Sequence, residues 1–145
     1  MSEYLPSPRR WVAEQVELYE GSGGTEGLTF RDTGLPVIIV THRGRKTGAI
    51  RKTPLMRVVD GNNYVLVASQ GGAPKNPLWY LNLKEDPNVE IRDKREVYAM
   101  QVREVVDPVE RERLWSIAVE AYPPYQEYQE KTDRVIPIFV AEPVE

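Results

Sequence analysis

Residues 53–69 read Thr53-Pro-Leu-Met-Arg-Val-Val59, then Asp60-Gly61-Asn62, then Asn63-Tyr-Val-Leu-Val-Ala-Ser69. The two outer runs are rich in apolar and β-branched residues, which favour strands. The Asp-Gly and Gly-Asn pairs between them tolerate the positive φ angles of a tight hairpin turn. The stretch therefore predicts two antiparallel strands joined by a short turn.

Four more segments on either side of this hairpin have strand character. Residues 35–41 are almost continuously apolar, so we expect that strand to be buried on both faces. Residues 89–92 and 96–106 predict a second hairpin, and residues 134–141 predict a closing strand. Pro137 lies inside this last run and argues for an edge strand or a bulge, because proline cannot donate to a sheet ladder.

Helices are predicted between and before these strands. Asn76 followed by Pro77 reads as an N-cap with proline at the first position of a helix over residues 78–84. Asp107 and Glu110 have capping-box spacing for a helix that runs to residue 121. A second helical piece begins near residue 124, and residues 9–20 have the spacing of a short amphipathic helix.

The order of these elements defines the fold class. Six strands joined mainly by hairpins are not an alternation of strand and helix, so a doubly wound parallel sheet is excluded. We predict a mainly β, α+β fold: a six-stranded antiparallel barrel with two or three helices and an N-terminal amphipathic helix. The 145 residues suffice for one domain. Residues 1–27 form the N-terminal helix and a glycine-rich hinge, and residues 28–145 form the barrel.

Composition limits the chemistry. The chain has no cysteine and one histidine, His42, which excludes a disulfide scaffold, thiol catalysis and a histidine-rich metal site. We therefore expect no metal. No run approaches the roughly 20 apolar residues of a membrane span, and the N-terminus lacks the pattern of a signal peptide. The cytoplasm is the expected location. The alternative for residues 9–20 is a peripheral anchor on the inner face of the membrane.

The net charge of −3 conceals a strong separation of charge. Residues 41–57 hold six basic and no acidic residues, a formal charge of +6, whereas residues 104–145 carry −6. Gly44 and Gly48 bound a turn whose backbone N–H groups can form an anion-binding nest. We interpret this window as an anion site. A solvated basic hairpin is the alternative. Nucleic-acid binding is the least supported interpretation, because no aromatic residues lie between the basic ones.

Several hydroxyl and aromatic groups are candidates for a ligand pocket. Ser69 ends an apolar strand beside a Gly-Gly loop, where it either contacts a ligand or caps a turn. Tyr122, Tyr125 and Tyr128 are spaced three apart, so they share one helix face as a ligand wall or as core. Trp79 and Tyr80 read as core more than as a cofactor platform.

These motifs together resemble the deazaflavin-dependent nitroreductases of actinobacteria. The similarity covers roughly residues 35–143, and its parts occur in the family's order. They are Gly44-Arg-Lys-Thr-Gly48, Arg51 to Met56, Ala68-Ser-Gln-Gly-Gly72, Lys75-Asn-Pro-Leu-Trp-Tyr-Leu-Asn82, Tyr122-Pro-x-Tyr-Gln-x-Tyr128 and Thr132-Asp-Arg134.

The resemblance implies a split β-barrel that binds coenzyme F420, an 8-hydroxy-5-deazaflavin with a phosphate and a polyglutamate tail. It places the acidic tail on Arg45, Lys46, Thr47, Arg51 and Lys52. It places the deazaflavin ring along three segments: Pro54, Leu55 and Met56; Val67, Ala68, Ser69 and Gln70; and Leu78, Trp79, Tyr80, Leu81 and Asn82. Thr53, beside the first segment, is also expected to bind the cofactor. Tyr122, Tyr125 and Tyr128 would line the substrate pocket. Tyr125 would touch both ring and substrate, and Ser69 and Tyr125 would be the catalytic pair.

The implied activity is hydride transfer from reduced F420 to a quinone-like or nitroaromatic acceptor such as a nitroimidazole. An FMN-binding split-barrel oxidoreductase is the alternative enzyme, and a non-catalytic F420 carrier is the alternative of another class. The expected partner is a small-molecule electron acceptor and not nucleic acid, and the chain is expected to be a monomer or a homodimer.

Overall fold

The computed structural model describes residues 3–30 and 33–144. Five residues lie outside the described part: 1, 2, 31, 32 and 145. The first two belong to the predicted segment 1–27, and the other three belong to the predicted segment 28–145. The elements, in order, are α1 (Arg10–Gly21), β1 (Val37–Arg43), β2 (Ile50–Met56), β3 (Val59–Asp60), β4 (Asn63–Val67), the 3₁₀ turn η1 (Gln70–Gly72), α2 (Leu78–Glu85), β5 (Asn88–Asp93), β6 (Glu96–Glu104), α3 (Pro108–Ala121), α4 (Pro124–Lys131) and β7 (Ile138–Pro143).

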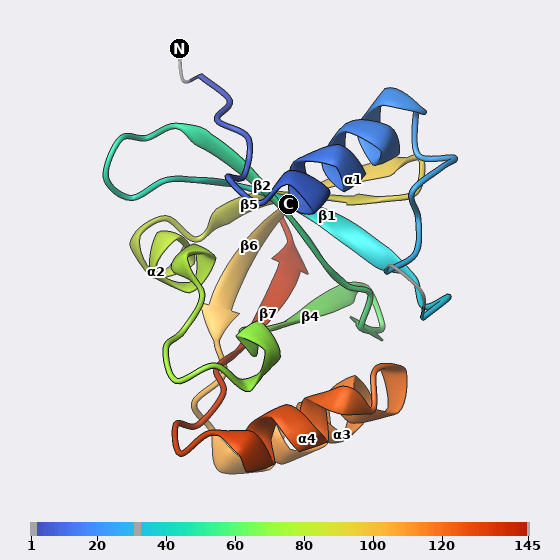
Figure 1. Cartoon of the computed structure of the whole chain (residues 1–145). Coiled ribbons are helices and arrows are strands. Elements are labelled where there is room, and N and C mark those ends of the chain that lie inside the picture. Colours follow the sequence, from blue (N-terminus) through green and yellow to red (C-terminus); the bar gives the residue numbers. More distant parts are fainter. Residues whose placement is uncertain (1–2, 31–32, 145) are drawn as a thin grey trace.

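The strands form one antiparallel sheet in the order β2-β1-β5-β6-β7-β4-β3. The sheet curls into a half-barrel, with α1 at one end and α3 and α4 side by side at the other (Figure 1). The antiparallel, hairpin-rich architecture was predicted, but the predicted count of six strands is wrong: the described residues form seven.

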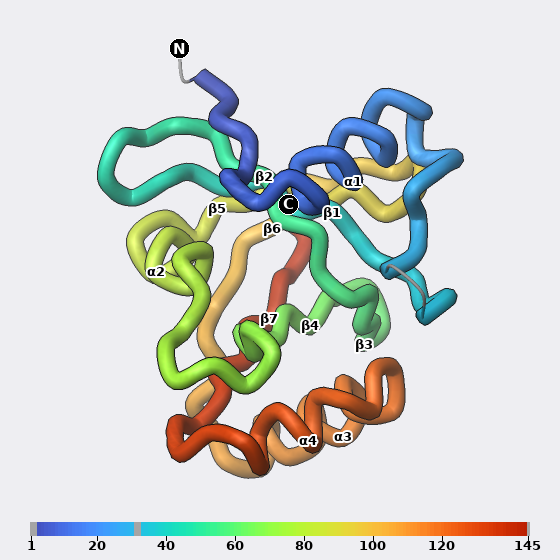
Figure 2. Tube along the Cα trace, in the orientation of Figure 1, coloured from blue at the N-terminus to red at the C-terminus, as the bar shows by residue number. Residues whose placement is uncertain are grey.

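The extra strand arises at a corner in the chain. The predicted strand over residues 53–59 splits into the end of β2 and the two-residue β3. The N–H of Arg57 still bonds to the carbonyl of Pro36 beside β1, whereas the carbonyl of the next residue, Val58, accepts from Val65 in β4. Successive residues therefore pair with opposite edges of the sheet, and the chain turns from one edge to the other here (Figure 2).

Two hydrophobic clusters lie on the two faces of the sheet. Val37 and Ile39 of β1 belong to the cluster that includes Val16 of α1. Ile38 and Val40 belong to the cluster on the other face, which includes Trp79. All four β1 residues are at most 2% exposed, so the predicted burial of this strand on both faces is confirmed.

Two local predictions need correction. The strand that follows Pro137 is not an edge, because β7 pairs with both β6 and β4. Pro137 precedes this strand. It has no backbone N–H that requires a partner, and its carbonyl accepts a hydrogen bond from the N–H of Ala68. At α2 the cap position is Pro77, not Asn76. The side chain of Asn76 instead accepts a hydrogen bond from Arg134. At α3 the predicted cap is present, because the Asp107 carboxylate accepts from the N–H of Glu110.

The N-terminal region is packed onto the half-barrel. Val12, Val16 and Tyr19 of α1 are buried, and the Tyr19 hydroxyl donates to Val37 and accepts from Lys94. Gly24 has φ +83°, and a Cβ there would lie 1.9 Å from a backbone oxygen of Lys94, so only glycine fits. Among the described residues, no helix is long and apolar enough to cross a bilayer.

Candidate functional site

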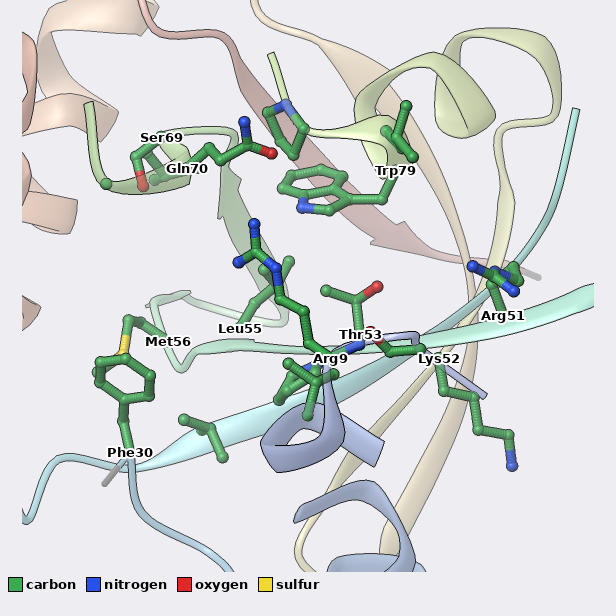
Figure 3. Close-up of a pocket in the computed structure, with 18 of the residues that line it drawn as sticks. Arg9, Phe30, Arg51, Lys52, Thr53, Leu55, Met56, Ser69, Gln70 and Trp79 are labelled. Atoms are coloured by element: carbon green, nitrogen blue, oxygen red, sulfur yellow. Dashed lines mark hydrogen bonds between the residues drawn. The ribbon is translucent and has the colours of Figure 1, made fainter. Parts of the chain in front are cut away.

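A cavity of about 400 Å³ lies where the two edges of the sheet face each other (Figure 3). One wall is β2, residues 51–56, and the opposite wall is the end of β4 with the loop that follows it. The start of α2, the tyrosines near α4 and parts of the N-terminal region, which include residues 7–9, 11 and 12, also line the cavity. The volume is within the range of sites for small molecules.

The edge strand β2 presents backbone groups to this cavity. Both the N–H and the C=O of Ile50 bond outward, to residues 3 and 5 of the N-terminal segment. Alternate residues of an antiparallel strand direct both groups to the same side. The backbone groups of Lys52 and Met56 therefore face the cavity side, and Pro54, which has no N–H to satisfy, suits an edge position.

Ser69 and Tyr125 contribute two hydroxyls to the cavity wall. Ser69 is 8% exposed and Tyr125 is 4% exposed, yet within residues 3–30 and 33–144 neither hydroxyl has a hydrogen-bond partner. Burial, with smaller contributions from the neighbouring tyrosines, raises the pKa of Tyr125 above its ordinary value. Tyr125 is therefore a protonated donor at neutral pH, and both hydroxyls are available to a ligand.

The three tyrosines form the wall beside these hydroxyls. Tyr122 follows the last residue of α3, whereas Tyr125 and Tyr128 lie on α4. The Tyr122 and Tyr125 rings are in edge contact at 4.9 Å, and the hydroxyls of Tyr122 and Tyr128 are 2.9 Å apart. The structure thus brings together the three residues that the sequence spacing had grouped.

Arg134 holds the loop that carries Ser69. Its guanidinium donates to the carbonyls of Ala68, Ser69 and Ala73 and to the side chain of Asn76, at 2.6 to 3.2 Å. These bonds fix the backbone on both sides of η1. A planar group with five donors suits this task better than lysine.

The positive end of the cavity is formed by Arg51 and Lys52. Arg51 donates to the carbonyl of Leu5. Lys52 pairs with Glu20 of α1 and lies 5.1 Å from the centre of the Tyr4 ring. The N-terminal segment therefore holds both cations at the edge of the cavity.

Most of the predicted site residues line this one cavity. They are Arg51, Lys52, Thr53, Pro54, Leu55, Met56, Val67, Ser69, Gln70, Leu78, Trp79, Asn82, Tyr122, Tyr125 and Tyr128.

Six predicted residues are not part of the lining. Arg45, Lys46 and Thr47 lie on the β1–β2 turn, and all three are exposed. Ala68 is fully buried, the Tyr80 hydroxyl bonds to Glu104, and Leu81 lies on the outer side of α2 with 37% exposure.

Sequence reasoning missed the lining residues from the N-terminal part of the chain. Arg9, Trp11 and Phe30 line the cavity, and Figure 3 shows the Arg9 guanidinium between β2 and Trp79. One feature of the sequence could have indicated a role for Arg9. Arg9 and Arg10 lie at the start of α1, where positive charge is unfavourable to a helix. His42, which was not among the predicted site residues, also lines the cavity.

Within the described ranges, no group of three or more His, Cys, Asp or Glu residues could hold a metal ion. The polar groups that face the cavity are hydroxyls, backbone groups and cations. This set suits a planar organic ligand with acceptor atoms and a negatively charged arm.

The comparisons with known proteins agree with this geometry. The family model described as F420H(2)-dependent quinone reductase matches residues 11–143. An F420H(2)-dependent quinone reductase of Mycobacterium tuberculosis is 39% identical over 144 residues, which cover 90% of this chain and 95% of that protein.

Two solved structures are similar over most of the chain. One, described as a domain-swapped dimer, is 47% identical with a TM-score of 0.72 and covers 94% of this chain and 100% of its own. Another, an F420-H2 dependent reductase, is 49% identical with a TM-score of 0.70 and covers 74% of this chain and 94% of its own.

Proposed function

The chain belongs to the F420H(2)-dependent quinone reductase family, and from this premise we propose that it transfers a hydride from reduced coenzyme F420 to a quinone. The protein is an oxidoreductase whose cofactor is F420. The observation that carries the proposal is the pair of unpartnered hydroxyls, Ser69 and Tyr125, in a cavity between an edge strand and an aromatic wall.

The cavity fits this cofactor in shape and charge. We place the planar ring beside β2 and Trp79, next to the Arg9 guanidinium and near Leu55 and Thr53, which rise from the strand (Figure 3). The negatively charged arm leaves the cavity past Arg51 and Lys52 toward the basic turn that carries Arg45, Lys46 and Thr47. Arginine and lysine are the usual partners of phosphate and carboxylate groups.

Bound F420 supplies a hydride from carbon 5 of its ring, and the protein supplies position and polarity. The buried walls hold the acceptor against the ring and exclude water. A quinone gains negative charge on oxygen as the hydride arrives. Ser69 and Tyr125 are neutral donors that can bond to that oxygen and stabilise the charge.

Substitution of these hydroxyls tests the proposal. Tyr125→Phe and Ser69→Ala remove one donor each, and the loss of a donor to a developing oxyanion lowers kcat by about 10²-fold. The assay is oxidation of reduced F420 by a quinone, followed as the absorbance of the oxidised ring returns. Tyr98→Phe is the control, because Tyr98 lies on β6 away from the cavity. Full turnover in both variants would refute the assigned roles.

Three finer points are part of the proposal. The acceptor range includes nitroaromatic compounds such as nitroimidazoles, because the aromatic wall accepts flat conjugated molecules.

The half-barrel is the split β-barrel of flavin reductases. The chain forms a homodimer, and this part of the proposal is supported by the structural relative described as a domain-swapped dimer. A cytoplasmic location and a peripheral membrane contact through α1 stay predictions.

The FMN alternative makes a different demand on the basic turn. FMN has one phosphate and no polyglutamate arm, so it would contact fewer of the cations at residues 43–52 than F420 would. Parallel fluorescence titrations with the two cofactors separate them: we expect tight binding of F420 only. A carrier would bind reduced F420 without quinone-dependent oxidation.

A further inference from the structure

A line of hydrogen bonds runs from the basic turn to the cavity. The backbone N–H of Arg45 lies 3.0 Å from Asn82 Oδ1. Asn82 Nδ2 lies 3.3 Å from His42 Nδ1, and His42 Nε2 lies 3.0 Å from Thr53 Oγ1. Four residues, one each from the β1–β2 turn, α2, β1 and β2, are thus connected end to end.

The first member of this line fixes the direction of the rest. A backbone N–H can only donate, so the oxygen of the Asn82 amide must face Arg45. The amide nitrogen then faces His42 and donates to Nδ1. Because Nδ1 accepts, the single proton of the neutral imidazole must be on Nε2.

The ring of His42 is neutral because it is buried among groups that disfavour a positive charge. It is 4% exposed, and burial, together with the charge of Arg51, lowers its pKa to about 4. With the proton on Nε2, His42 donates to Thr53, and the oxygen of Thr53 is the acceptor.

The hydroxyl proton of Thr53 must then point elsewhere. Within the described part of the chain Thr53 has no side-chain partner other than His42, and its side chain rises from β2 into the cavity (Figure 3). We propose that His42 and Asn82 are positioning residues that set the Thr53 hydroxyl as a hydrogen-bond donor to an acceptor oxygen of the bound cofactor.

This inference rests on the proposed function for the identity of the ligand. F420 offers acceptor oxygens on its ring system, on its ribityl chain and on its phosphate and polyglutamate arm. The line of bonds favours a ligand that presents an acceptor to Thr53, because the bond from His42 uses one lone pair of the hydroxyl oxygen and leaves its proton to be donated. It thus specifies polarity as well as shape at this point of the wall.

The direction of the line is testable without any ligand. His42 is the only histidine, so protein labelled with ¹⁵N-histidine gives one pair of ring nitrogen signals. Long-range ¹H–¹⁵N correlation at neutral pH should show the Nε2–H tautomer. A proton on Nδ1 would reverse the line and overturn the inference.

The role of Thr53 is tested by fluorescence titration with F420. Thr53→Val keeps the shape of the side chain and removes the donor, so Kd should rise about tenfold. Thr53→Ser should restore binding. The matched control is Thr41→Val on β1, outside the cavity lining. A Kd unchanged in Thr53→Val would overturn the inference, whereas no binding by the wild-type protein would refute the proposed function itself.

Two further arms complete the design. His42→Leu combined with Thr53→Val should bind F420 no worse than Thr53→Val alone, because His42 acts through Thr53; additive losses would contradict this. Titration with the deazaflavin ribityl alcohol, which lacks the phosphate arm, identifies the oxygen. A tenfold loss in Thr53→Val with this probe assigns the ring system or its ribityl chain, and a loss only with complete F420 assigns the phosphate and glutamate arm.

Discussion

Glu20 controls the charge that Lys52 presents to a ligand. The two side chains form an ion pair at the edge of the cavity, each about one quarter exposed. A carboxylate here competes with an anionic cofactor for the lysine. We expect Glu20→Gln to lower the Kd for F420 several-fold, measured by fluorescence titration at low salt, with a smaller effect at high salt. Glu17→Gln, on the same helix, is the control. A higher Kd in Glu20→Gln would mean that the pair positions Lys52 for the cofactor.

Arg9 is the cavity residue that the sequence least indicated. Its guanidinium extends into the cavity (Figure 3). We expect Arg9→Gln to raise the Kd for F420 about tenfold, because the ligand is negatively charged. Arg10→Gln is a matched control, since Arg10 is 92% exposed and pairs with Glu14 on the surface. Equal effects of the two substitutions would show that only net charge matters.

At this scale the sequence indicated residue types better than residue contacts. Ser69 and Tyr125 stood out because a hydroxyl at a strand end and a repeated tyrosine are visible as patterns. Arg9 and His42 did not, because their roles depend on which distant strand or helix packs beside them. The bonds of His42 join residues 11 and 40 positions away.

Among the elements, η1 connects the loop that carries Ser69 to the wall formed by Tyr122, Tyr125 and Tyr128. Gly72 has φ +80°, and an added Cβ would lie 2.8 Å from the backbone oxygen of Tyr128. We expect Gly72→Ala to lower the free energy of unfolding by about 2 kcal/mol or more and to lower quinone turnover, because the wall must shift. Denaturant unfolding and the quinone assay measure the two effects.

Gly71 provides the control for that experiment. It has φ +65° with open space around an added Cβ. Gly71→Ala therefore isolates the backbone strain, about 1 kcal/mol. If both substitutions cost the same, the contact between η1 and α4 contributes nothing to the effect.

The elements themselves were largely predictable from local patterns, and their junctions were not. The turn at Asp60-Gly61-Asn62 and the cap at Asp107 follow from chemistry within a few residues. The corner between Arg57 and Val58 and the interior position of β7 depend on pairing with strands far along the chain. Likewise, the local sequence predicts Asn76 as a helix cap. Its actual bond to Arg134 spans 58 positions, so no local pattern could indicate it.

For the molecule as a whole, the buried His42 makes stability depend on pH. Its pKa is about 4 in the folded protein and 6.5 in the unfolded chain. Above pH 6.5 both states are neutral and the group has no effect. As the pH falls from 6.5 to 4, only the unfolded state takes up a proton, so stability decreases by about 3 kcal/mol.

Comparison with His42→Gln isolates this effect, because the carboxylates titrate alike in both proteins. Urea unfolding at pH 7 and pH 4 should show a larger decrease for the wild-type protein. Equal decreases in the two proteins would show that His42 is not held neutral by the fold.

The whole molecule separates its charge in the way that the proposed activity needs. Five of the six cations of residues 41–57 lie on β1, β2 and their turn, and two of them, Arg51 and Lys52, line one end of the cavity. The hydroxyls and tyrosines occupy the other end, where the acceptor meets the ring. With the hydride supplied by the cofactor, the chain needs neither cysteine nor a protonated histidine.

The most direct test is oxidation of reduced F420 by a quinone in the presence of the purified protein. We expect the absorbance of oxidised F420 to return at a rate proportional to protein concentration, only when quinone is added, with neither reduced FMN nor NADPH able to replace reduced F420 as the electron donor. Tight binding of F420 without quinone-dependent oxidation, or equal reduction of the quinone by reduced FMN, would contradict the assignment.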